Sequence, residues 1–337
     1  MRVLVTGGTG YIGSHTCVEL LNDNNEVIII DNLSNSREDV VDKIEEITHR
    51  NVKFYKEDCR DKDLLRYIFK LNKIDAVLHF AGLKSVGESL EKPLEYYDNN
   101  IGSTIRLSEV MSEYDCNTIV FSSSANVYGE PECLPLKETA NVGNTTNPYG
   151  TSKYFNERIL ADVAGSNPYF SVVLLRYFNP LGAHPSGLIG ENPLDIPNNL
   201  MPYIVKVATK ELPVFHVYGN DYDTLDGTGV RDYIHVVDLA RGHIKALQYA
   251  LNNPGVRVYN LGTGKGYSVL EVIKAFEKAN NLKLNYQIDE RRPADIAVSY
   301  ADPTKANKEL NWYATHTLED MCKDSYNYAV KTLKLTK

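Results

Sequence analysis

The sequence predicts a doubly wound α/β fold, in which helices cover both faces of a parallel sheet, and three observations support this prediction. Short β-branched runs alternate with helix-length segments through the first half of the chain. A glycine-rich turn follows the first of these runs. After about residue 179, closely spaced prolines and glycines interrupt the alternation. We therefore expect a second, smaller α/β domain beyond that point.

The strand-like runs of the first half are rich in Val, Ile, Leu and Phe, as strands buried on both faces require. They lie near Val3–Thr6, Val27–Asp31, Val52–Lys56, Ala76–Phe80, Thr118–Ser122 and Val172–Arg176. The segments between them can each hold one helix. Such an alternation of strands and crossover helices gives a parallel sheet.

Shorter strands and helices are predicted for the second half of the chain. Strands are expected at Val214–Tyr218 and Leu284–Ile288, and helices near Ser268–Asn280 and Leu318–Lys331. Tyr233–Val237 and Val258–Leu261 also have the pattern of strands, so we expect the chain to return there to the first sheet. The predicted first domain comprises residues 1–179 and about 233–262, and the second comprises about 180–232 and 263–337.

The composition is that of an ordinary globular protein and excludes several classes. The chain has 337 residues, of which 43% are hydrophobic, and a formal net charge of -8. Without a Lys/Arg-rich run, the acidic balance argues against nucleic-acid binding. The longest apolar runs are far shorter than the roughly 18 residues that a membrane-spanning helix needs.

The five cysteines are widely spaced and include no Cys-x-x-Cys pair. Reduced thiols in a cytoplasmic protein fit this pattern best, and we identify no targeting signal. The histidines include no His-x-x-x-His pair, so we expect no metal site.

A phosphate-binding turn is predicted between the first strand and the helix that begins near Tyr11. The segment 6–13 reads TGGTGYIG and satisfies the G-x-G-x-x-G spacing of Rossmann-type domains. Gly7 and Gly10 permit the tight turn and the approach of backbone to a pyrophosphate, and Gly13 permits close packing of the helix. The N–H groups at the helix start then favour phosphate. We expect a dinucleotide here, although a bare turn is the alternative.

Asp31 ends the second strand, eighteen residues beyond Gly13. A carboxylate there accepts hydrogen bonds from the adenine ribose and repels a 2′-phosphate, so NAD is favoured over NADP, although Arg37 lies nearby. Polar and small residues follow the third and fourth strands, where open α/β sheets bind ligands: Asp58, Phe80, Ala81, Gly82 and Lys84. Ordinary loop residues remain the alternative for these positions.

A catalytic group is predicted where the fifth strand meets a helix entered through Pro148. Tyr149 and Lys153, four residues apart, share one helix face, and the strand ends at Ser124. A tyrosine with a pKa near 10 needs a shift of about three units to act as a base at neutral pH, and a lysine ammonium and an oxidised nicotinamide both favour the phenolate. Ser124 is expected to hold the same substrate oxygen, unless it only caps the turn.

These motifs together resemble the extended short-chain dehydrogenase/reductase family, and within it the UDP-glucose 4-epimerases. The resemblance is carried by the glycine turn, Tyr149-x-x-x-Lys153 and Ser124, and by the blocks FAGLK (80–84), PLEYYDNN (93–100), LRYFNP (175–180), GAHP (182–185) and GTGVRDYIHV (227–236). It extends from residue 1 to about residue 325.

The resemblance implies an NAD-dependent 4-epimerase that interconverts UDP-glucose and UDP-galactose through a transient 4-keto sugar. Tyr149 would take the proton of the 4-hydroxyl, and Lys153 would also hold the nicotinamide ribose. The resemblance further implies a homodimer formed through residues 93–113 and 149–165. The implied NAD contacts are Gly7, Gly10, Tyr11, Ile12, Gly13, Asp31, Asn32, Asn35, Ser36, Asp58, Cys59, Phe80, Ala81, Gly82, Lys84, Asn99, Ser122, Tyr149, Lys153 and Phe178.

The UDP-sugar is implied to contact a second set of residues, in which arginine forks suit the pyrophosphate. The set comprises Lys84, Ser124, Tyr149, Asn179, Asn199, Leu200, His216, Tyr218, Arg231, Arg292, Asp295 and Ser299. For the two arginines, a surface ion pair is the alternative.

Two positions depart from the family pattern. Asn126 stands where threonine is usual, and we expect a minor effect. Ser299 occupies the far wall of the sugar pocket, where relatives restricted to glucose carry tyrosine. A small residue leaves room for a 2-acetamido group, so we expect UDP-GlcNAc and UDP-GalNAc to be substrates too, unless Tyr300 refills the space.

Two other functions compete with epimerisation. A nucleotide-sugar 4,6-dehydratase shares the fold but places an Asp-Glu pair after the serine, where this chain has Ala125 and Asn126. A non-catalytic NAD-sensing protein could dispense with Tyr149 and Lys153, yet both are present.

Overall fold

A seven-stranded parallel sheet forms the larger part of the computed structural model, which describes residues 1–193, 199–292 and 296–332. Its order is β10-β6-β5-β4-β1-β2-β3, and every neighbouring pair is parallel. The strands are β1 (Arg2–Thr6), β2 (Glu26–Ile30), β3 (Lys53–Tyr55), β4 (Ala76–His79), β5 (Thr118–Ser124), β6 (Ser171–Tyr177) and β10 (Gly255–Leu261). The predicted doubly wound fold is confirmed, as are all six strands expected in the first half.

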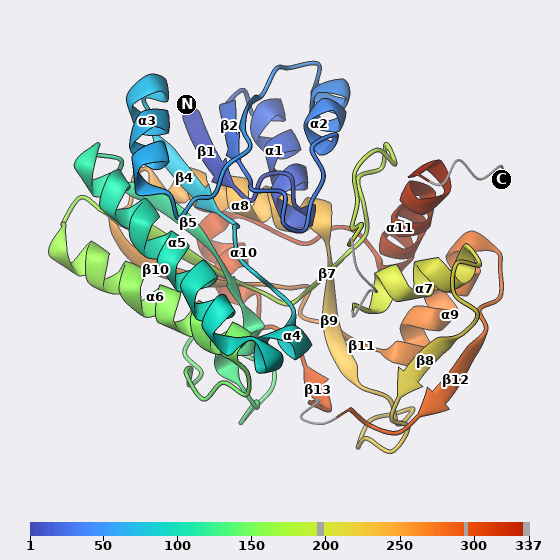
Figure 1. The fold of residues 1–337 in the computed structure, drawn as a ribbon. Helices are drawn as coiled ribbons and strands as arrows, with labels where there is room; N and C mark the ends of the chain where they lie inside the picture. Colours follow the sequence, from blue (N-terminus) through green and yellow to red (C-terminus); the bar gives the residue numbers. More distant parts are fainter. Residues whose placement is uncertain (194–198, 293–295, 333–337) are drawn as a thin grey trace.

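Helices cover both faces of this sheet (Figure 1). One face carries α1 (Tyr11–Asn22), α2 (Val40–Thr48) and α8 (Val236–Ala250), and the other carries α3 (Lys62–Asn72), α5 (Pro93–Glu113) and α6 (Pro148–Ser166). The alternation of strand side chains divides the core accordingly. Val3 and Val5 of β1 pack with the first set of helices, whereas Leu4 packs with the second.

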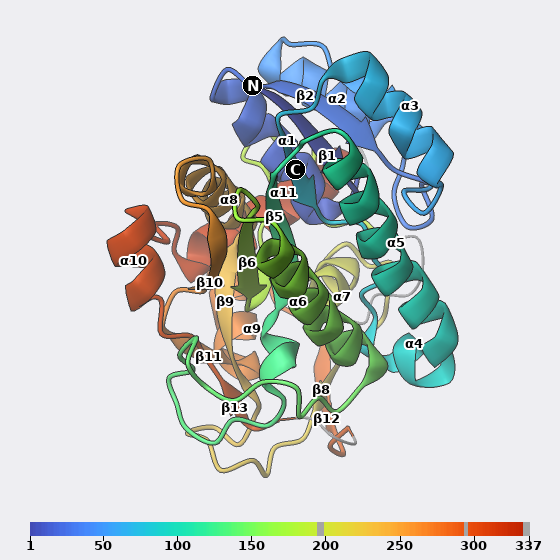
Figure 2. The ribbon, with the colours of Figure 1, turned by 90° about the vertical axis from the view of Figure 1, so that its left-hand side faces the viewer.

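The second region contains two small sheets. A four-stranded sheet joins β7 (Asn179–Leu181), β9 (Val230–His235), β11 (Gly266–Ser268) and β13 (Val298–Ser299), and a two-stranded sheet pairs β8 (Phe215–Tyr218) with β12 (Tyr286–Asp289). The helices α7 (Leu200–Ala208), α9 (Val269–Asn280) and α11 (Leu318–Thr332) share a core with them. Figure 2 shows this region beside the carboxyl ends of the large sheet. Three short helices, α4 (Val86–Glu91), α10 (Thr304–Leu310) and the 3-10 turn Ala125–Tyr128, complete the fold.

One predicted strand is wrong in part. Val258–Leu261 does return to the large sheet as part of β10, but Tyr233–Val237 does not. Tyr233 belongs to β9, which pairs with β7 in the small sheet, and Val236 already begins α8. His235 causes the change, because its side chain accepts a hydrogen bond from the backbone N–H of Val237 and caps the helix.

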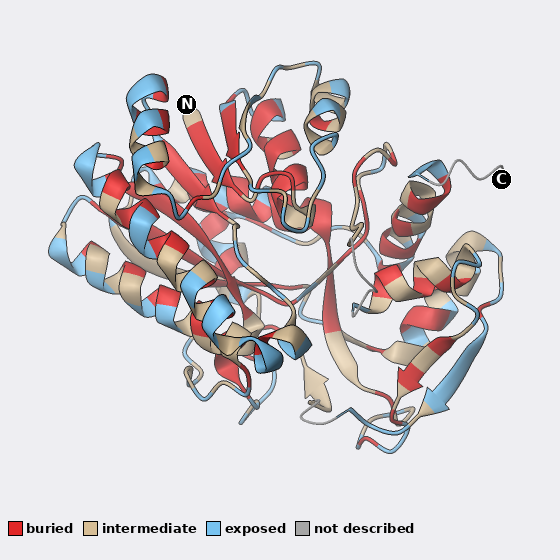
Figure 3. Cartoon of the chain, in the orientation of Figure 1, coloured by how far each residue is buried: buried red, intermediate tan, exposed pale blue. Residues whose placement is uncertain are grey.

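Burial follows the two cores (Figure 3). All seven residues of β5 and of β6 are buried, whereas the outer faces of α5 and α6 are exposed. Among the described residues, no helix is both long and apolar enough to span a membrane.

Candidate active site

The glycine turn brings backbone N–H groups to the carboxyl edge of the large sheet. Gly7 has a φ of +72°, and a side chain there would place its Cβ 2.8 Å from the backbone nitrogen of Ala81. The turn ends at Gly10, the N-cap of α1, which makes no side-chain cap. The first N–H groups of α1 are therefore available to an anion, as a pyrophosphate site requires.

Asp31 lies beside this turn at the end of β2. Its carboxylate accepts hydrogen bonds from the backbone N–H of Thr9 (3.1 Å), the backbone N–H of Leu33 (2.9 Å) and the hydroxyl of Ser36 (3.0 Å). These bonds fix a negative charge at the adenosine end of the turn. That arrangement fits a ribose diol and disfavours a 2′-phosphate.

A cavity of about 530 Å³ runs from Asp31 to the predicted catalytic group. Phe178 is the one predicted NAD contact that does not line it, because its side chain is buried with Val127, Tyr128 and Leu136. All the others do: Gly7, Gly10, Tyr11, Ile12, Gly13, Asp31, Asn32, Asn35, Ser36, Asp58, Cys59, Phe80, Ala81, Gly82, Lys84, Asn99, Ser122, Tyr149 and Lys153. Helix N-terminus, carboxylate and elongated cavity together fit NAD.

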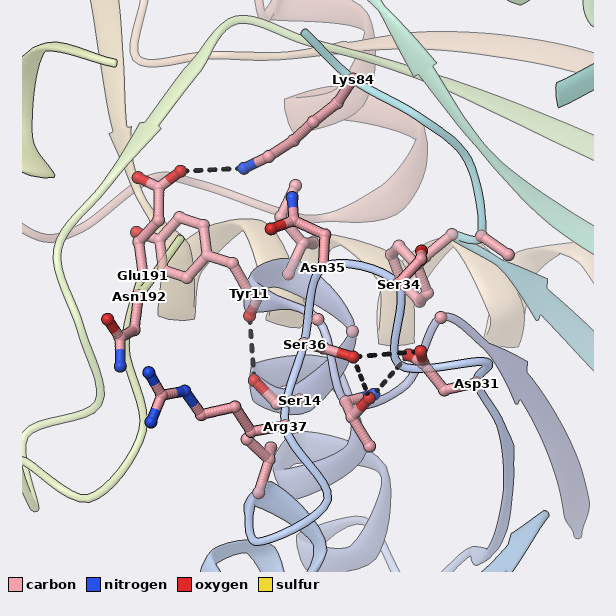
Figure 4. A pocket seen from close by; sticks show the side chains of 18 of the residues that line it. Tyr11, Ser14, Asp31, Ser34, Asn35, Ser36, Arg37, Lys84, Glu191 and Asn192 are labelled. Atoms are coloured by element: carbon pink, nitrogen blue, oxygen red, sulfur yellow. Dashed lines mark hydrogen bonds and ion pairs between the residues drawn. The ribbon is translucent and has the colours of Figure 1, made fainter. Parts of the chain in front are cut away.

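The sequence reasoning missed the opposite wall of this cavity, segment 187–193 (Figure 4). Glu191 in this segment accepts hydrogen bonds from Lys84 Nζ (2.9 Å) and Asn199 Nδ2 (2.8 Å). Burial acts to lower the pKa of Lys84, but the Glu191 carboxylate outweighs it, so that pKa is raised. No local motif signals these contacts, because Lys84 and Glu191 are 107 residues apart in the chain.

Tyr149 and Lys153 project from the first turns of α6 toward the end of β5. Pro148 begins this helix, and the Asn147 side chain caps it by accepting a hydrogen bond from the backbone N–H of Gly150. Lys153 Nζ donates to the backbone carbonyl of Ser122 (2.7 Å) and lies 5.9 Å from the centre of the Tyr149 ring. Burial lowers the pKa of Lys153 to about 8.

Ser124 ends β5 and faces Tyr149. Its Oγ accepts hydrogen bonds from the backbone N–H (3.2 Å) and the side-chain Nδ2 (3.0 Å) of Asn126. The lone pairs of Ser124 are thereby occupied, so its O–H is the donor in the hydrogen bond with Tyr149. The residue that departs from the family pattern thus orients the serine.

Burial raises the pKa of Tyr149, while a hydrogen bond with Ser124 and the charge of Lys84 act to lower it. The charge of Lys84 therefore favours the phenolate, a contribution that the sequence pattern did not suggest. The sequence pattern suggested Lys153 because it lies on the same helix. The contribution of Lys84 depends on the loop after β4, which only the folded chain brings to Tyr149.

A row of rings lies on β8 and its surroundings, in the second region. The rings of Tyr203 and His216 are stacked at 6.4 Å, as are those of His216 and Tyr218, and the guanidinium of Arg292 lies 4.4 Å over the Tyr218 ring. His216 is also paired with Asp289. Flat surfaces beside a cation suit a nucleobase with attached phosphates.

Arg231 and Ser299 are register partners in the parallel pair of β9 and β13. Their side chains therefore point to the same side of the sheet. The Tyr300 ring lies 3.8 Å from where a Cβ on Gly266 would be, so it packs along β11.

The remaining predicted substrate contacts are spread around this region. Asn179 begins β7, Asn199 is the N-cap of α7, and Leu200 is its first residue. Asp295 lies outside the described residues. Among the residues that the structure does describe, no cluster of three or more His, Cys, Asp or Glu side chains could hold a metal ion.

Comparison with known proteins agrees with this geometry. Residues 4–325 match the family model described as GDP-mannose 4,6 dehydratase. The UDP-glucose 4-epimerase of Pasteurella multocida is 56% identical over 334 residues, which cover 99% of each chain.

Two solved structures superpose over nearly the whole length. The UDP-glucose 4-epimerase of Bifidobacterium longum, in complex with NAD+ and UDP, has a TM-score of 0.96 and 56% identity, and the match covers 99% of each chain. The enzyme of Stenotrophomonas maltophila, with bound NAD and formylated UDP-arabinopyranose, has a TM-score of 0.97 and 48% identity over 100% of each chain. Identity this high over whole chains shows the family as well as the fold. The chain belongs to the UDP-glucose 4-epimerase family of short-chain dehydrogenase/reductases.

Proposed function

We propose that the chain is an NAD-dependent epimerase that interconverts UDP-glucose and UDP-galactose by oxidising and re-reducing carbon 4 of the sugar. One observation carries the proposal. Tyr149, whose hydroxyl is hydrogen-bonded with Ser124, lines one end of a cavity whose far end has the carboxylate and helix N-terminus of an NAD site.

The chain's own residues move the proton and hold the sugar. Bound NAD supplies a hydride acceptor for carbon 4 and a positive ring charge that favours the Tyr149 phenolate. Tyr149 takes the proton of the 4-hydroxyl, and the Ser124 hydroxyl donates to the same oxygen. After the 4-keto sugar has turned in the pocket, Tyr149 returns the proton to the new 4-hydroxyl. The reaction is redox-neutral.

The UDP moiety binds between the ring row and the arginines. Tyr218 offers a face to uracil, and Arg231 and Arg292 contact the pyrophosphate. The substrate-binding roles of Asn179, Asn199, Leu200, His216 and Asp295 belong to the same proposal. A dehydratase is not favoured, since Ala125 and Asn126 supply no carboxylate next to Ser124.

The sugar range includes 2-acetamido sugars, so UDP-GlcNAc and UDP-GalNAc are interconverted as well. The small side chain of Ser299 and the placement of the Tyr300 ring along β11 support this part of the proposal.

The working form is a cytoplasmic homodimer joined through α5 and α6. Large apolar side chains are exposed on these helices: Leu94 is 80% exposed and Phe155 is 44% exposed. Isolated exposed apolar residues are common, but two on adjacent helices suit a partner surface. The division into an NAD domain (1–179 and about 233–262) and a UDP-sugar domain belongs to this proposal.

The test is turnover of UDP-galactose by the purified protein and by Tyr149→Phe. Removing the phenol oxygen removes the base, so we expect kcat to fall by about 10²–10⁴-fold. Bound NAD, measured in the denatured supernatant, should be unchanged, because the rest of the cavity is intact. Undiminished epimerisation by Tyr149→Phe, or binding without product by the wild type, contradicts the proposal.

A further inference from the structure

Glu157 is a buried carboxylate on the catalytic helix to which the mechanism gives no role. It lies four residues after Lys153 and eight after Tyr149, so all three side chains share one face of α6. That face lies against β5, whose last three residues are serines (Figure 2). The side chain of Glu157 is 6% exposed.

Both carboxylate oxygens of Glu157 are bound by two neighbouring strands. Arg176 of β6 donates from Nε to Oε1 (2.9 Å) and from Nη2 to Oε2 (2.7 Å), as a two-pronged fork. Ser123 of β5 donates its hydroxyl to Oε1 (2.5 Å). Ser123 and Arg176 are themselves register partners, so helix and strands form a closed triangle.

Arg176 is fixed on its other sides as well. Its Nη1 donates to the backbone carbonyl of Glu138 (3.3 Å), and its guanidinium lies 4.8 Å over the ring of Tyr128. The arginine side chain is 5% exposed. The Arg176 guanidinium is therefore held independently of α6, and the Glu157 carboxylate can bind it in one position only.

Apolar side chains could hold α6 on the sheet without the desolvation cost of a buried ion pair. A leucine face, however, tolerates sliding and rotation, whereas a planar fork accepts a carboxylate in one orientation. A shift of one residue along a helix moves a side chain by about 1.5 Å. Because a misplacement of about 1 Å can cost about 10²-fold in rate, the exact seating of α6 matters to the chemistry.

We infer that Glu157 is a positioning residue, whose three-way contact with Arg176 and Ser123 sets the register of α6 on β5. This register places Lys153 Nζ on the Ser122 carbonyl and holds the Tyr149 hydroxyl opposite Ser124. The inference rests on the proposed epimerase activity, since its readout is turnover.

The first test removes one hydroxyl. Ser123→Ala deletes the bond to Glu157 and leaves the ion pair intact. We expect kcat with UDP-galactose to fall by about three- to tenfold and KM to stay within about twofold, because the substrate contacts are untouched. The control is Ser171→Ala, which removes a buried strand hydroxyl of β6 that donates to the carbonyl of Asn253 (3.1 Å), a residue outside α6. It should leave both constants unchanged.

The second test removes the fork without leaving a lone buried charge. Glu157→Gln alone would leave the buried Arg176 guanidinium without a counter-charge, and the resulting loss of stability could be mistaken for a loss of activity. The double variant Glu157→Gln/Arg176→Met avoids this. We expect a fall in kcat of about 10–100-fold, with KM within about twofold and bound NAD unchanged. The exposed pair of Arg66 and Glu113 is the control, and Arg66→Met/Glu113→Gln should turn over like the wild type.

The pH profile separates positioning from general damage. The Ser124 hydrogen bond and the nearby Lys84 charge both lower the pKa of Tyr149. When α6 loses its register, the Tyr149 hydroxyl moves away from both groups, and its pKa rises. The rising limb of kcat against pH should then move to higher pH in the double variant and stay in place in the control.

Each result has one meaning. Folded Ser123→Ala and double variants with wild-type kcat and an unmoved limb overturn the inference. So does a proportional loss of kcat, bound NAD and thermal stability, which marks a purely structural pair. An inactive wild type instead contradicts the proposed function and leaves no turnover from which to judge Glu157.

Discussion

Tyr149 illustrates how a single residue depends on its surroundings for its chemistry. Burial raises the pKa of its phenol, which works against a role as a base. Ser124 and Lys84 act in the opposite direction, and Lys84 is itself kept charged by Glu191. The chain from Glu191 through Lys84 to Tyr149 therefore tunes the base.

Lys84→Met should expose this dependence. Because the Lys84 charge lowers the pKa of Tyr149, its loss raises that pKa, and the phenolate then forms only at higher pH. We expect the rising limb of kcat against pH to move upward. The measurement compares enzymes with equal bound NAD. Lys43→Met removes a cation that lines the same cavity and pairs with the exposed Glu46, so it should leave the limb in place. If the rising limb of kcat against pH does not move in Lys84→Met, the Lys84 charge does not affect the pKa of Tyr149.

Ser299→Tyr tests the sugar range at the residue scale. Under the proposed sugar range, we expect a tyrosine on the same side of β13 as Arg231 to fill the space of a 2-acetamido group and to leave room for a 2-hydroxyl. We expect turnover of UDP-GlcNAc to fall at least tenfold and turnover of UDP-glucose to change by less than about threefold. Ser299→Ala, which keeps the site open, should retain both activities. Equal loss of the two activities in Ser299→Tyr contradicts the assignment.

At the element scale, the sequence patterns were most informative for buried parallel strands. All six strands of the first half were predicted, because near-continuous apolar runs have one stable environment. The error at Tyr233–Val237 arose because an apolar run does not show which sheet a strand joins or where the next helix begins. The His235 cap and the pairing of β9 with β7 decided between them.

The helices α5 and α6 pack together through buried amides. Asn156 Nδ2 donates to the Asn100 carbonyl (2.9 Å), and Asn100 Nδ2 donates to Ser152 Oγ (2.9 Å). These bonds hold the inner faces of the two helices together within one chain. The apolar side chains left on their outer faces are the ones assigned to the partner subunit.

Leu94→Glu/Phe155→Glu should therefore dissociate the proposed dimer. Two carboxylates placed on each copy cannot be desolvated in an apolar interface, so we expect the mass measured by light scattering to fall to that of a monomer. Leu225→Glu is the control, since that side chain is fully exposed on a loop of the second region. A double variant that elutes with the mass of the wild type would place any interface elsewhere.

At the scale of the whole molecule, charged hydrogen bonds join the two regions. Asp238, in the first turn of α8, accepts hydrogen bonds from the backbone N–H groups of Thr315 (2.8 Å) and His316 (2.9 Å), just before α11. The His316 ring also lies 2.9 Å from its carboxylate. Burial acts to raise the pKa of Asp238, but the bonds with His316 outweigh it and hold that pKa at about 2. In turn, the Asp238 hydrogen bond raises the pKa of His316.

Stability should depend on pH through this contact. A histidine whose pKa is raised on folding contributes fully below its unfolded value of about 6.5, and the contribution is lost as pH rises through the folded value. The Asp238 contribution is present above about 3.9 and is lost as pH falls toward about 2. The melting temperature of His316→Gln should therefore lie below that of the wild type by about 1–2 °C at pH 5–6, and the gap should close by pH 9. A gap independent of pH means that the imidazolium charge does not contribute.

The sequence alone is enough to predict the parallel sheet, the glycine turn and the candidate catalytic residues. It could do so because apolar periodicity, glycine spacing and a Tyr-x-x-x-Lys pair are local patterns, each set by the geometry of one element. The surroundings of these residues become visible only in the folded chain. Glu191 beside Lys84 and Arg176 against Glu157 join segments that no local pattern relates. The reason is physical, since electrostatic tuning and helix seating depend on distances in space between elements that folding alone brings together.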